Sequence, residues 1–188
     1  MTDKIKTDYN INGRSRLKTD EAYQIKEAVP ELNGQEFRPL IYQGQVIPGY
    51  EIAKDGLVVS YKRYKDGQTM GWAGVGSHGT KYPAVRLQLP VECLSYVNKN
   101  AVTFNHTTQQ QARSIKVHIL VADSWLDIEE ECPDTLKPWW KDIPLEFKKS
   151  LRPFFSIDHK DDNRLNPHVD NLKFVSPREN QACIKANS

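Results

Sequence analysis

Short runs of hydrophobic residues, separated by polar turns, predict a chain built mainly from short strands and helices. From Phe37 to about Phe104 the runs have the length and residue types of strands. Within YEIAKDGLVVS, the pair Asp55-Gly56 lies between two β-rich flanks, which predicts a hairpin. KYPAVRLQL predicts another strand that ends at Pro90. This region is therefore expected to form a small β-rich unit.

Helical patterns flank the β-rich region. Thr19 can cap a helix over TDEAYQIKEAV, which Pro30 would end. SIKVHILVADSWL predicts a strand that continues into a short helix, within which His118 is expected to be a packing or capping residue. That helix is expected to bury four residues on adjacent turns, which are Leu120, Val121, Ser124 and Trp125.

The C-terminal pattern predicts a strand, a long loop, a second strand and a helix. FFSIDH and LKFV are the two strand-like runs, and the connection KDDNRLNPHVDN is rich in Asp, Asn and Pro, as surface loops are. Ser176 and Glu179 have the spacing of a capping box, and Pro177 suits the first helical position. The helix is therefore expected to begin next to Ser176.

This arrangement places polar residues with hydrolytic chemistry near one another. Asp158 and His159 end the first strand, and Asn180 lies in the first helical turn, so the three are expected to meet across a narrow cleft. An imidazole can deprotonate water near neutral pH, and carboxylate and amide oxygens suit magnesium. The residues alone are also compatible with a purely structural role, in which Asn171 caps the loop and Asn180 faces solvent.

Composition and charge exclude few classes of protein. The chain has 188 residues, of which 38% are hydrophobic and 27% charged, and its net charge of +2 is too small to indicate a nucleic-acid partner. No apolar run approaches the roughly 20 residues of a membrane span, and the N-terminus lacks a secretory pattern, which favours a cytoplasmic protein. Cys93, Cys132 and Cys183 are widely spaced, which argues against a disulfide framework or a zinc site.

Two further segments have alternative interpretations. The glycine-rich stretch MGWAGVGSHGT fits neither of the common phosphate-binding patterns, so a hairpin loop is expected there. Residues 126–152 combine acidic residues, prolines and a possible helix in PLEFKKSL. The pair Trp139-Trp140 in this segment suits the core of a small insertion, although paired aromatics can also stack on bases.

The segment DHKDDNRLNPHVDNLKFVSPREN resembles, without gaps, the HNH nuclease motif of phage and intron-encoded homing endonucleases, which is roughly DHxDGNxxNNxxxNLxWVTxxEN. PGYEIAKDGLVVS, KYPAVRL and VHILVADSW resemble, in the family's order, the small module and linking helix that often precede this motif. The resemblance covers most of Pro48 to Gln181. The chain departs from the family at Ala53-Lys54, Asp162, Pro167-His168 and Phe174, of which Asp162 replaces a usual glycine.

The resemblance implies roles for individual residues. Asp158 and Asn180 would bind a divalent cation, Mg²⁺ or another such as Mn²⁺, and His159 would activate water. Asn171 would hold the loop so that His159 points correctly, and Asn163 and Asn166 would have structural roles. Phosphate contacts to double-stranded DNA are expected from Lys62, Arg63, Lys65, Lys81, Arg86, Arg164 and Arg178.

The expected architecture is an α+β protein with a C-terminal ββα-metal unit of the HNH, or His-Me finger, type behind a β-rich module. We place an N-terminal arm at 1–37, the DNA-binding module at 38–110 and the nuclease domain at 111–188, with an insertion at 126–152. The expected function is a metal-dependent DNA endonuclease that nicks one strand per active site. It would act without a membrane, in the cytoplasm of a phage-infected bacterial cell, as a monomer or weak dimer.

Two alternatives remain from other functional classes. One is a DNA-binding protein that keeps the fold and has lost catalysis. The other is a phage protein that engages a host protein through Trp139 and Trp140.

Overall fold

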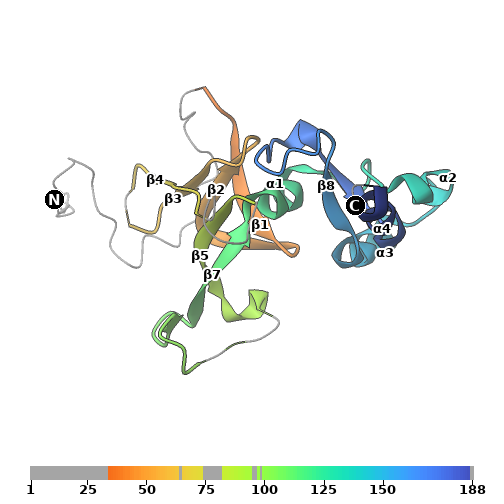
Figure 1. Ribbon diagram of the computed structural model, residues 1–188. Helices are drawn as coiled ribbons and strands as arrows, with labels where there is room; N and C mark the ends of the chain where they lie inside the picture. The colour runs from red at the N-terminus through yellow and green to blue at the C-terminus, as the bar shows by residue number, and fades with distance from the viewer. Residues whose placement is uncertain (1–33, 64, 74–81, 95–96, 98, 187–188) are drawn as a thin grey trace, which may run out of the picture.

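The computed structural model describes residues 34–63, 65–73, 82–94, 97 and 99–186, and it confirms the α+β class. Its first sheet is antiparallel, with strand order β1-β2-β3-β4 (Figure 1). The four strands are β1 (Phe37–Tyr42), β2 (Gln45–Ala53), β3 (Val58–Ser60) and β4 (Gln68–Met70). The hairpin predicted at Asp55-Gly56 is confirmed, because β2 pairs with β3 from Tyr50↔Ser60 to Ile52↔Val58.

A second antiparallel sheet has the order β5-β7-β6. It is formed by β5 (Ala84–Pro90), β6 (Phe104–Asn105) and β7 (Gln110–Lys116), and the short 3₁₀ helix η1 (Val91–Cys93) follows β5. The strand predicted in KYPAVRLQL is confirmed, including its end at Pro90. Its inward residues Val85, Leu87 and Leu89 alternate with outward ones and are fully buried.

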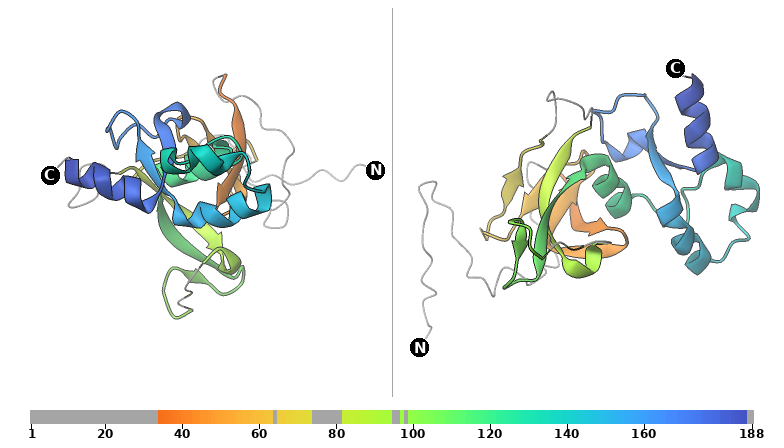
Figure 2. Two further views of the ribbon diagram at one scale, coloured as in Figure 1. Left: turned by 90° about the vertical axis from the view of Figure 1, so that its right-hand side faces the viewer. Right: turned by 60° about the horizontal axis from the view of Figure 1, so that its bottom comes forward.

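Helix α1 (Val117–Trp125) follows β7 directly and lies between the two sheets and the C-terminal unit (Figures 1 and 2). All four residues predicted to face the core are buried. Two hydrogen bonds fasten the helix to the first sheet: Trp125 Nε1 donates to the Ile52 carbonyl at 3.2 Å, and the Ile41 amide donates to Ser124 Oγ at 2.9 Å. Helix α1 therefore connects the β-rich part to the rest of the molecule.

The insertion at 126–152 folds into short helices on the far side of the C-terminal unit from α1 (Figure 2). Its elements are η2 (Asp134–Leu136), α2 (Lys137–Trp140) and α3 (Leu145–Leu151), with η3 (Arg152–Phe154) following them, so the helix predicted in PLEFKKSL is confirmed. The two tryptophans of this segment differ in solvent exposure. Trp140 is 4% exposed and packs against Phe155, whereas Trp139 is 61% exposed.

The C-terminal unit has the predicted order of strand, loop, strand and helix. It consists of β8 (Ser156–His159), η4 (Val169–Asn171), β9 (Leu172–Val175) and α4 (Pro177–Ala186). The two strands are antiparallel, with Asp158 opposite Lys173 and His159 opposite Leu172. This is a ββα arrangement, as expected.

One hydrophobic core runs through these parts. It contains Leu40 and Ile52 of the first sheet, Leu87 of the second, Leu120 of α1 and Leu172 of β9. The domain boundaries drawn at 37/38 and 110/111 stay predictions. The helix predicted in TDEAYQIKEAV lies outside the described residues, as does most of MGWAGVGSHGT. Within the described ranges, no helix has the length and apolarity needed to cross a membrane.

The turn between β2 and β3 contacts the loop that follows β8. The Val169 amide donates to the Lys54 carbonyl at 2.9 Å. Gly56, whose φ is +88°, lies against Val117 at the start of α1 and against Pro167 of the loop. The β-rich module therefore supports the loop of the C-terminal unit directly.

Candidate functional site

Strand β8 presents two different faces to its surroundings. Side chains alternate along a strand, so Ser156 and Asp158 lie on one face while Ile157 and His159 lie on the other. Ile157 packs against the hydrophobic core and His159 is 4% exposed, which identifies their face as the inner one. His159 therefore does not share a face of β8 with Asp158, and the structure does not bring the three predicted site residues together on one face. Asp158 keeps 29% of its side chain exposed, and its Oδ2 lies 3.9 Å from Lys173 Nζ.

Asn180 lies on the same face of β8 as Asp158. Its Nδ2 donates to Ser156 Oγ at 3.4 Å, and its backbone amide donates to the Ser176 carbonyl at 3.0 Å. Ser156 and Asp158 are two residues apart and share a face of the strand. Because the Asn180 side chain contacts Ser156, it lies on that same face as Asp158. The predicted capping box sets this position, because Ser176 Oγ accepts from the Glu179 amide and Glu179 Oε2 accepts from the Ser176 amide.

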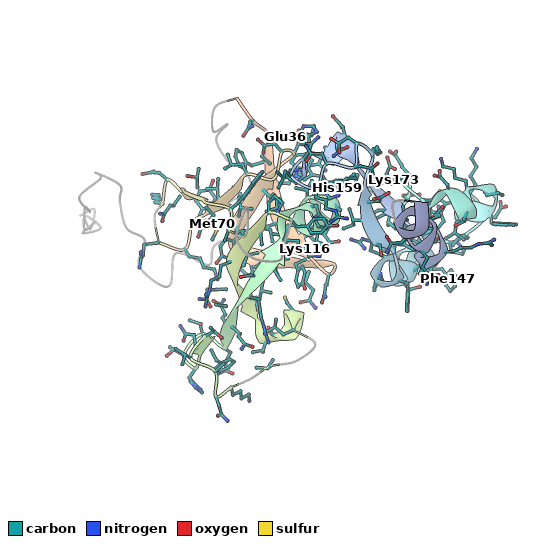
Figure 3. All side chains as sticks on the ribbon, in the orientation of Figure 1. Glu36, Met70, Lys116, Phe147, His159 and Lys173 are labelled. Carbon is teal, nitrogen blue, oxygen red and sulfur yellow. The ribbon has the colours of Figure 1, made fainter. Side chains whose placement is uncertain are left out.

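His159, which is labelled in Figure 3, lies in an aromatic cluster on the inner face. Its ring is 5.0 Å from that of His118, in an edge-to-face arrangement, and 5.9 Å from that of Tyr82. Burial lowers the pKa of His159, although the neighbouring carboxylates Asp158 and Asp161 oppose this effect. Its Nε2 is buried and has no hydrogen-bond partner among the described residues. The lowered pKa favours the neutral imidazole, the form that can accept a proton.

His118 is a packing residue, as predicted. It is 5% exposed, and its ring lies 4.8 Å from that of Tyr82. Burial, with smaller contributions from His159 and Lys116, lowers its pKa to about 3. No local pattern singles out Tyr82, because this residue precedes a strand and reaches His159 through the tertiary fold.

The loop after β8 is closed by Asn171, which is 9% exposed. Its Oδ1 accepts from the Asp161 amide at 3.0 Å, and its Nδ2 donates to Asp161 Oδ1 and to the Asn166 carbonyl, both at 2.8 Å. Asn163 and Asn166 also make hydrogen bonds within this loop, in agreement with structural roles. Asp162 has a φ of +57°, which explains why glycine suits this position. That the loop orients His159 stays a prediction.

Asp158 and Asn180 fit a hard divalent cation. Together they offer a carboxylate and an amide oxygen on one face of β8, with the Asn180 nitrogen directed to Ser156. Magnesium binds oxygen ligands and keeps several waters, so two protein oxygens suit it. In the part of the chain that the structure describes, no group of three or more His, Cys, Asp or Glu side chains could hold a metal ion.

The residues predicted to contact DNA are found in different environments. Five of them are exposed on the surface: Arg63, Lys65, Arg86, Arg164 and Arg178. Lys62 is engaged internally, since its Nζ donates to the Gln88 carbonyl at 3.2 Å and to Gln110 Oε1 at 3.0 Å. Burial lowers the pKa of Lys62 to about 8. Lys81 lies outside the described residues.

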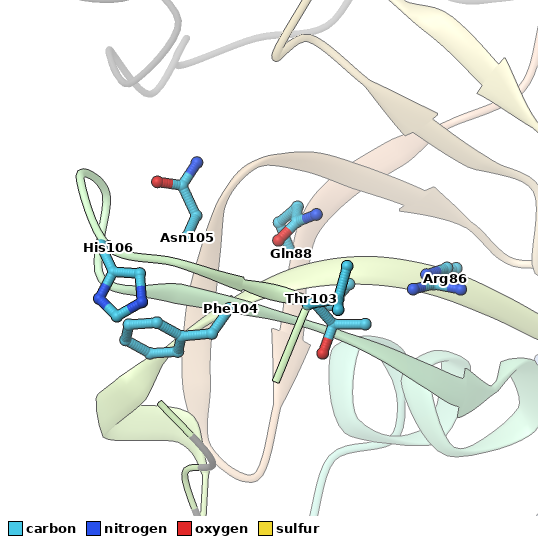
Figure 4. A pocket seen from close by; sticks show the side chains of 8 residues that line it. Arg86, Gln88, Thr103, Phe104, Asn105 and His106 are labelled. Carbon is cyan, nitrogen blue, oxygen red and sulfur yellow. The ribbon is translucent and has the colours of Figure 1, made fainter. Parts of the chain in front are cut away.

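Arg86 is exposed and lines a cavity of about 500 Å³ on the second sheet (Figure 4). The sequence did not predict this cavity, because its walls come from β5 and from the region around β6, which are joined by a long connection. Phe104 and His106 form one end, with ring centroids 4.8 Å apart. The cavity is lined by elements of the β-rich module and not by β8, β9 or α4.

Comparisons with known proteins gave one structural likeness. No family model matches the chain, and no curated protein matches it. The chain resembles the solved structure of "DNA binding and cleavage by the HNH homing endonuclease I-HmuI", with 20% sequence identity and a TM-score of 0.45. The match covers 81% of this chain and 59% of that chain. The chain thus spans less than two thirds of that protein, and the functional argument rests on the geometry of β8, β9 and α4.

Proposed function

We propose that this protein is a metal-dependent DNA endonuclease of the HNH type that nicks one strand per active site. The observation that carries the proposal is the end of β8, where a buried imidazole with a lowered pKa directly follows Asp158, which in turn shares a face with Asn180. A base and a pair of hard oxygen ligands are the parts that phosphodiester hydrolysis requires.

The proposed roles follow from the two faces of the strand. Asp158 and Asn180 would hold the cation, which neutralises charge that develops on the leaving oxygen. His159 would take a proton from the attacking water on the other side of β8. A phosphodiester bound across the end of the strand would then meet the base and the ligands from opposite sides, as an in-line displacement needs. Lys173, 3.9 Å from Asp158, adds positive charge on the ligand side.

Double-stranded DNA is the proposed partner. Arg164 lies in the loop between β8 and β9, and Arg178 lies in the first turn of α4, so two exposed cations flank the proposed cleavage site. Arg86 offers a further exposed cation on the β-rich module. Contacts of this kind bind phosphates irrespective of sequence, and their strength falls with salt concentration.

Plasmid nicking tests the proposal. We expect the wild-type protein to nick supercoiled DNA with Mg²⁺ and not with a chelator, and we expect His159→Gln to lower the rate about 100-fold or more. Asp158→Asn should lower activity at low Mg²⁺ concentration. Glu146→Gln, at an exposed carboxylate of α3, is the matched control and should leave nicking unchanged.

Because His159 is buried, urea unfolding of His159→Gln must show a folded protein before its activity is interpreted. Wild-type nicking rates from a folded His159→Gln protein would remove the imidazole from the mechanism.

A DNA-binding protein without catalysis is the second candidate. The 4% exposure of His159 favours it, since an imidazole must reach water to act as a base. Tight DNA binding without metal-dependent nicking would support this candidate. A host-protein anchor formed by both tryptophans is less consistent with the fold, because Trp140 is buried and engaged with Phe155.

A further inference from the structure

The insertion at 126–152 makes two hydrogen bonds to the start of α4, and both come from Thr135. The backbone amide of Thr135, in η2, donates to Glu179 Oε1 at 2.7 Å. The Thr135 hydroxyl also donates to Ser176 Oγ at 3.1 Å. Both acceptors belong to the capping box of α4, so the insertion contacts the residues that fix where this helix begins.

We call Thr135, Ser176 and Glu179 the α4 capping cluster. Each carboxylate oxygen of Glu179 accepts one backbone amide, from Ser176 and from Thr135. Ser176 Oγ likewise contacts both partners, because it accepts from the Glu179 amide and from the Thr135 hydroxyl. Ser176 is 9% exposed and its bonds are partly buried, whereas Thr135 is exposed and its amide bond to Glu179 lies at the surface. The cluster is a closed set of hydrogen bonds in which Thr135 is the member from outside the ββα unit.

Asn180 directly follows this cluster in the chain. Its backbone amide donates to the Ser176 carbonyl. Among the described residues, its side chain is held against β8 by the long 3.4 Å bond to Ser156. A bond of that length constrains the side chain weakly. The position of the Asn180 oxygen therefore depends mainly on the first turn of α4, which the capping cluster fixes.

The insertion is held to the rest of the molecule by an aromatic contact, while Thr135 itself lies at the surface. Trp140 is buried, lies 6.1 Å from the Phe155 ring and donates from its Nε1 to the Glu129 carbonyl at 3.1 Å. Phe155 in turn packs against Phe174 of β9. The insertion thus contacts the ββα unit through its aromatic core, through Thr135, and through the Arg152 guanidinium, which lies 4.5 Å from the centre of the Phe174 ring.

We propose that Thr135 is a positioning residue for Asn180, and that the insertion supports the cation-binding side of the site through the α4 capping cluster. This inference rests on the proposed function, because it takes Asn180 to be a ligand of the catalytic cation. The link between Thr135 and α4 can nevertheless be measured in the protein without metal.

The test compares Thr135→Val, which keeps the shape and loses the hydroxyl, with Thr135→Ser, which keeps the hydroxyl. In metal-free protein, hydrogen exchange at the Glu179 and Asn180 amides should be about 3- to 10-fold faster in Thr135→Val and near wild type in Thr135→Ser. Thr69→Val, at an exposed threonine of β4, is the matched control and should change neither amide.

Mn²⁺ affinity then tests the step from α4 to Asn180. Thr135→Val should weaken Mn²⁺ binding by about 3- to 10-fold, and this effect should disappear in an Asn180→Ala background. An equal effect with and without Asn180 would overturn the inference, since Thr135 would then act elsewhere. Unchanged affinity in Thr135→Val would overturn it too, if Asn180→Ala weakens binding.

The two proposals can fail separately. If neither the wild type nor Asn180→Ala binds Mn²⁺ measurably, the cation site of the proposed function fails. Hydrogen exchange then decides on the link between Thr135 and α4, and unchanged exchange in Thr135→Val overturns that link whatever the activity.

Discussion

Asn171 makes three hydrogen bonds that close the loop between β8 and β9. Its side-chain oxygen accepts one of them and its side-chain nitrogen donates the other two. No other residue type of this size offers one acceptor and two donors in this geometry. An aspartate at this position would lose both donors and would place a second carboxylate beside Asp161. The amide is therefore required for the shape of the loop, independently of any reaction.

We expect Asn171→Ala to destabilise the protein by about 2–3 kcal/mol, because it removes three partly buried hydrogen bonds made by one buried amide group. Asn163→Ala, which loses one bond at an exposed site, should cost at most about 1 kcal/mol. Urea unfolding measures both values. Equal costs for the two variants would show that burial of the Asn171 bonds contributes little.

The turn between β2 and β3 is an element whose sequence suits both its own conformation and its neighbours. Gly56 has a positive φ, which favours glycine, and a Cβ atom there would collide with Val117. Gly44 also has a positive φ, of +75°, yet a Cβ atom there would meet nothing within 4 Å. An alanine at Gly44 therefore adds backbone strain alone, whereas an alanine at Gly56 adds the same strain and a steric clash.

Gly44→Ala should cost about 1 kcal/mol, the strain of a left-handed alanine. Gly56→Ala should cost about 1–3 kcal/mol more, since α1 and the loop must move apart to admit the methyl group. The difference between the two free energies of unfolding is the quantity to measure. A difference near zero would mean that the turn and α1 are not packed as closely as the structure shows.

At the scale of the whole molecule, two buried histidines, His118 and His159, lie where α1 packs against the ββα unit. The pKa of His118 falls from 6.5 to about 3, with His159, Tyr82 and Lys116 facing it. Because the folded pKa is below the unfolded one, protonation favours the unfolded chain. Stability is therefore retained above pH 6.5 and lost as the pH falls from 6.5 toward 3.

Between pH 7 and pH 4.5, this titration should remove about 2–3 kcal/mol of stability. His118→Phe keeps an aromatic ring and removes the titrating group, so its stability should fall less steeply over the same range by about that amount. Urea unfolding at the two pH values gives the comparison. Parallel pH dependences for the two proteins would show that His118 is not buried in its neutral form.

Much of the fold could be predicted because it depends on neighbours within a few residues. The hairpin at Asp55-Gly56, the strand ending at Pro90 and the capping box at Ser176 each follow from local turn, strand or helix chemistry. Loop closure by Asn171 was anticipated from the resemblance to the HNH motif. The order of elements around Asp158, His159 and Asn180 was also fixed by the sequence.

The tertiary structure decided which side chains are buried and which face one another. Only the packing of α1 between distant segments brings His118 and Tyr82 against His159, and only the sheet arrangement engages the Lys62 ammonium internally. The same holds for the insertion, where Trp140 is buried while its neighbour Trp139 is exposed. Sequence patterns specify an element and its faces, whereas burial depends on contacts between segments far apart in the chain, which no local pattern contains.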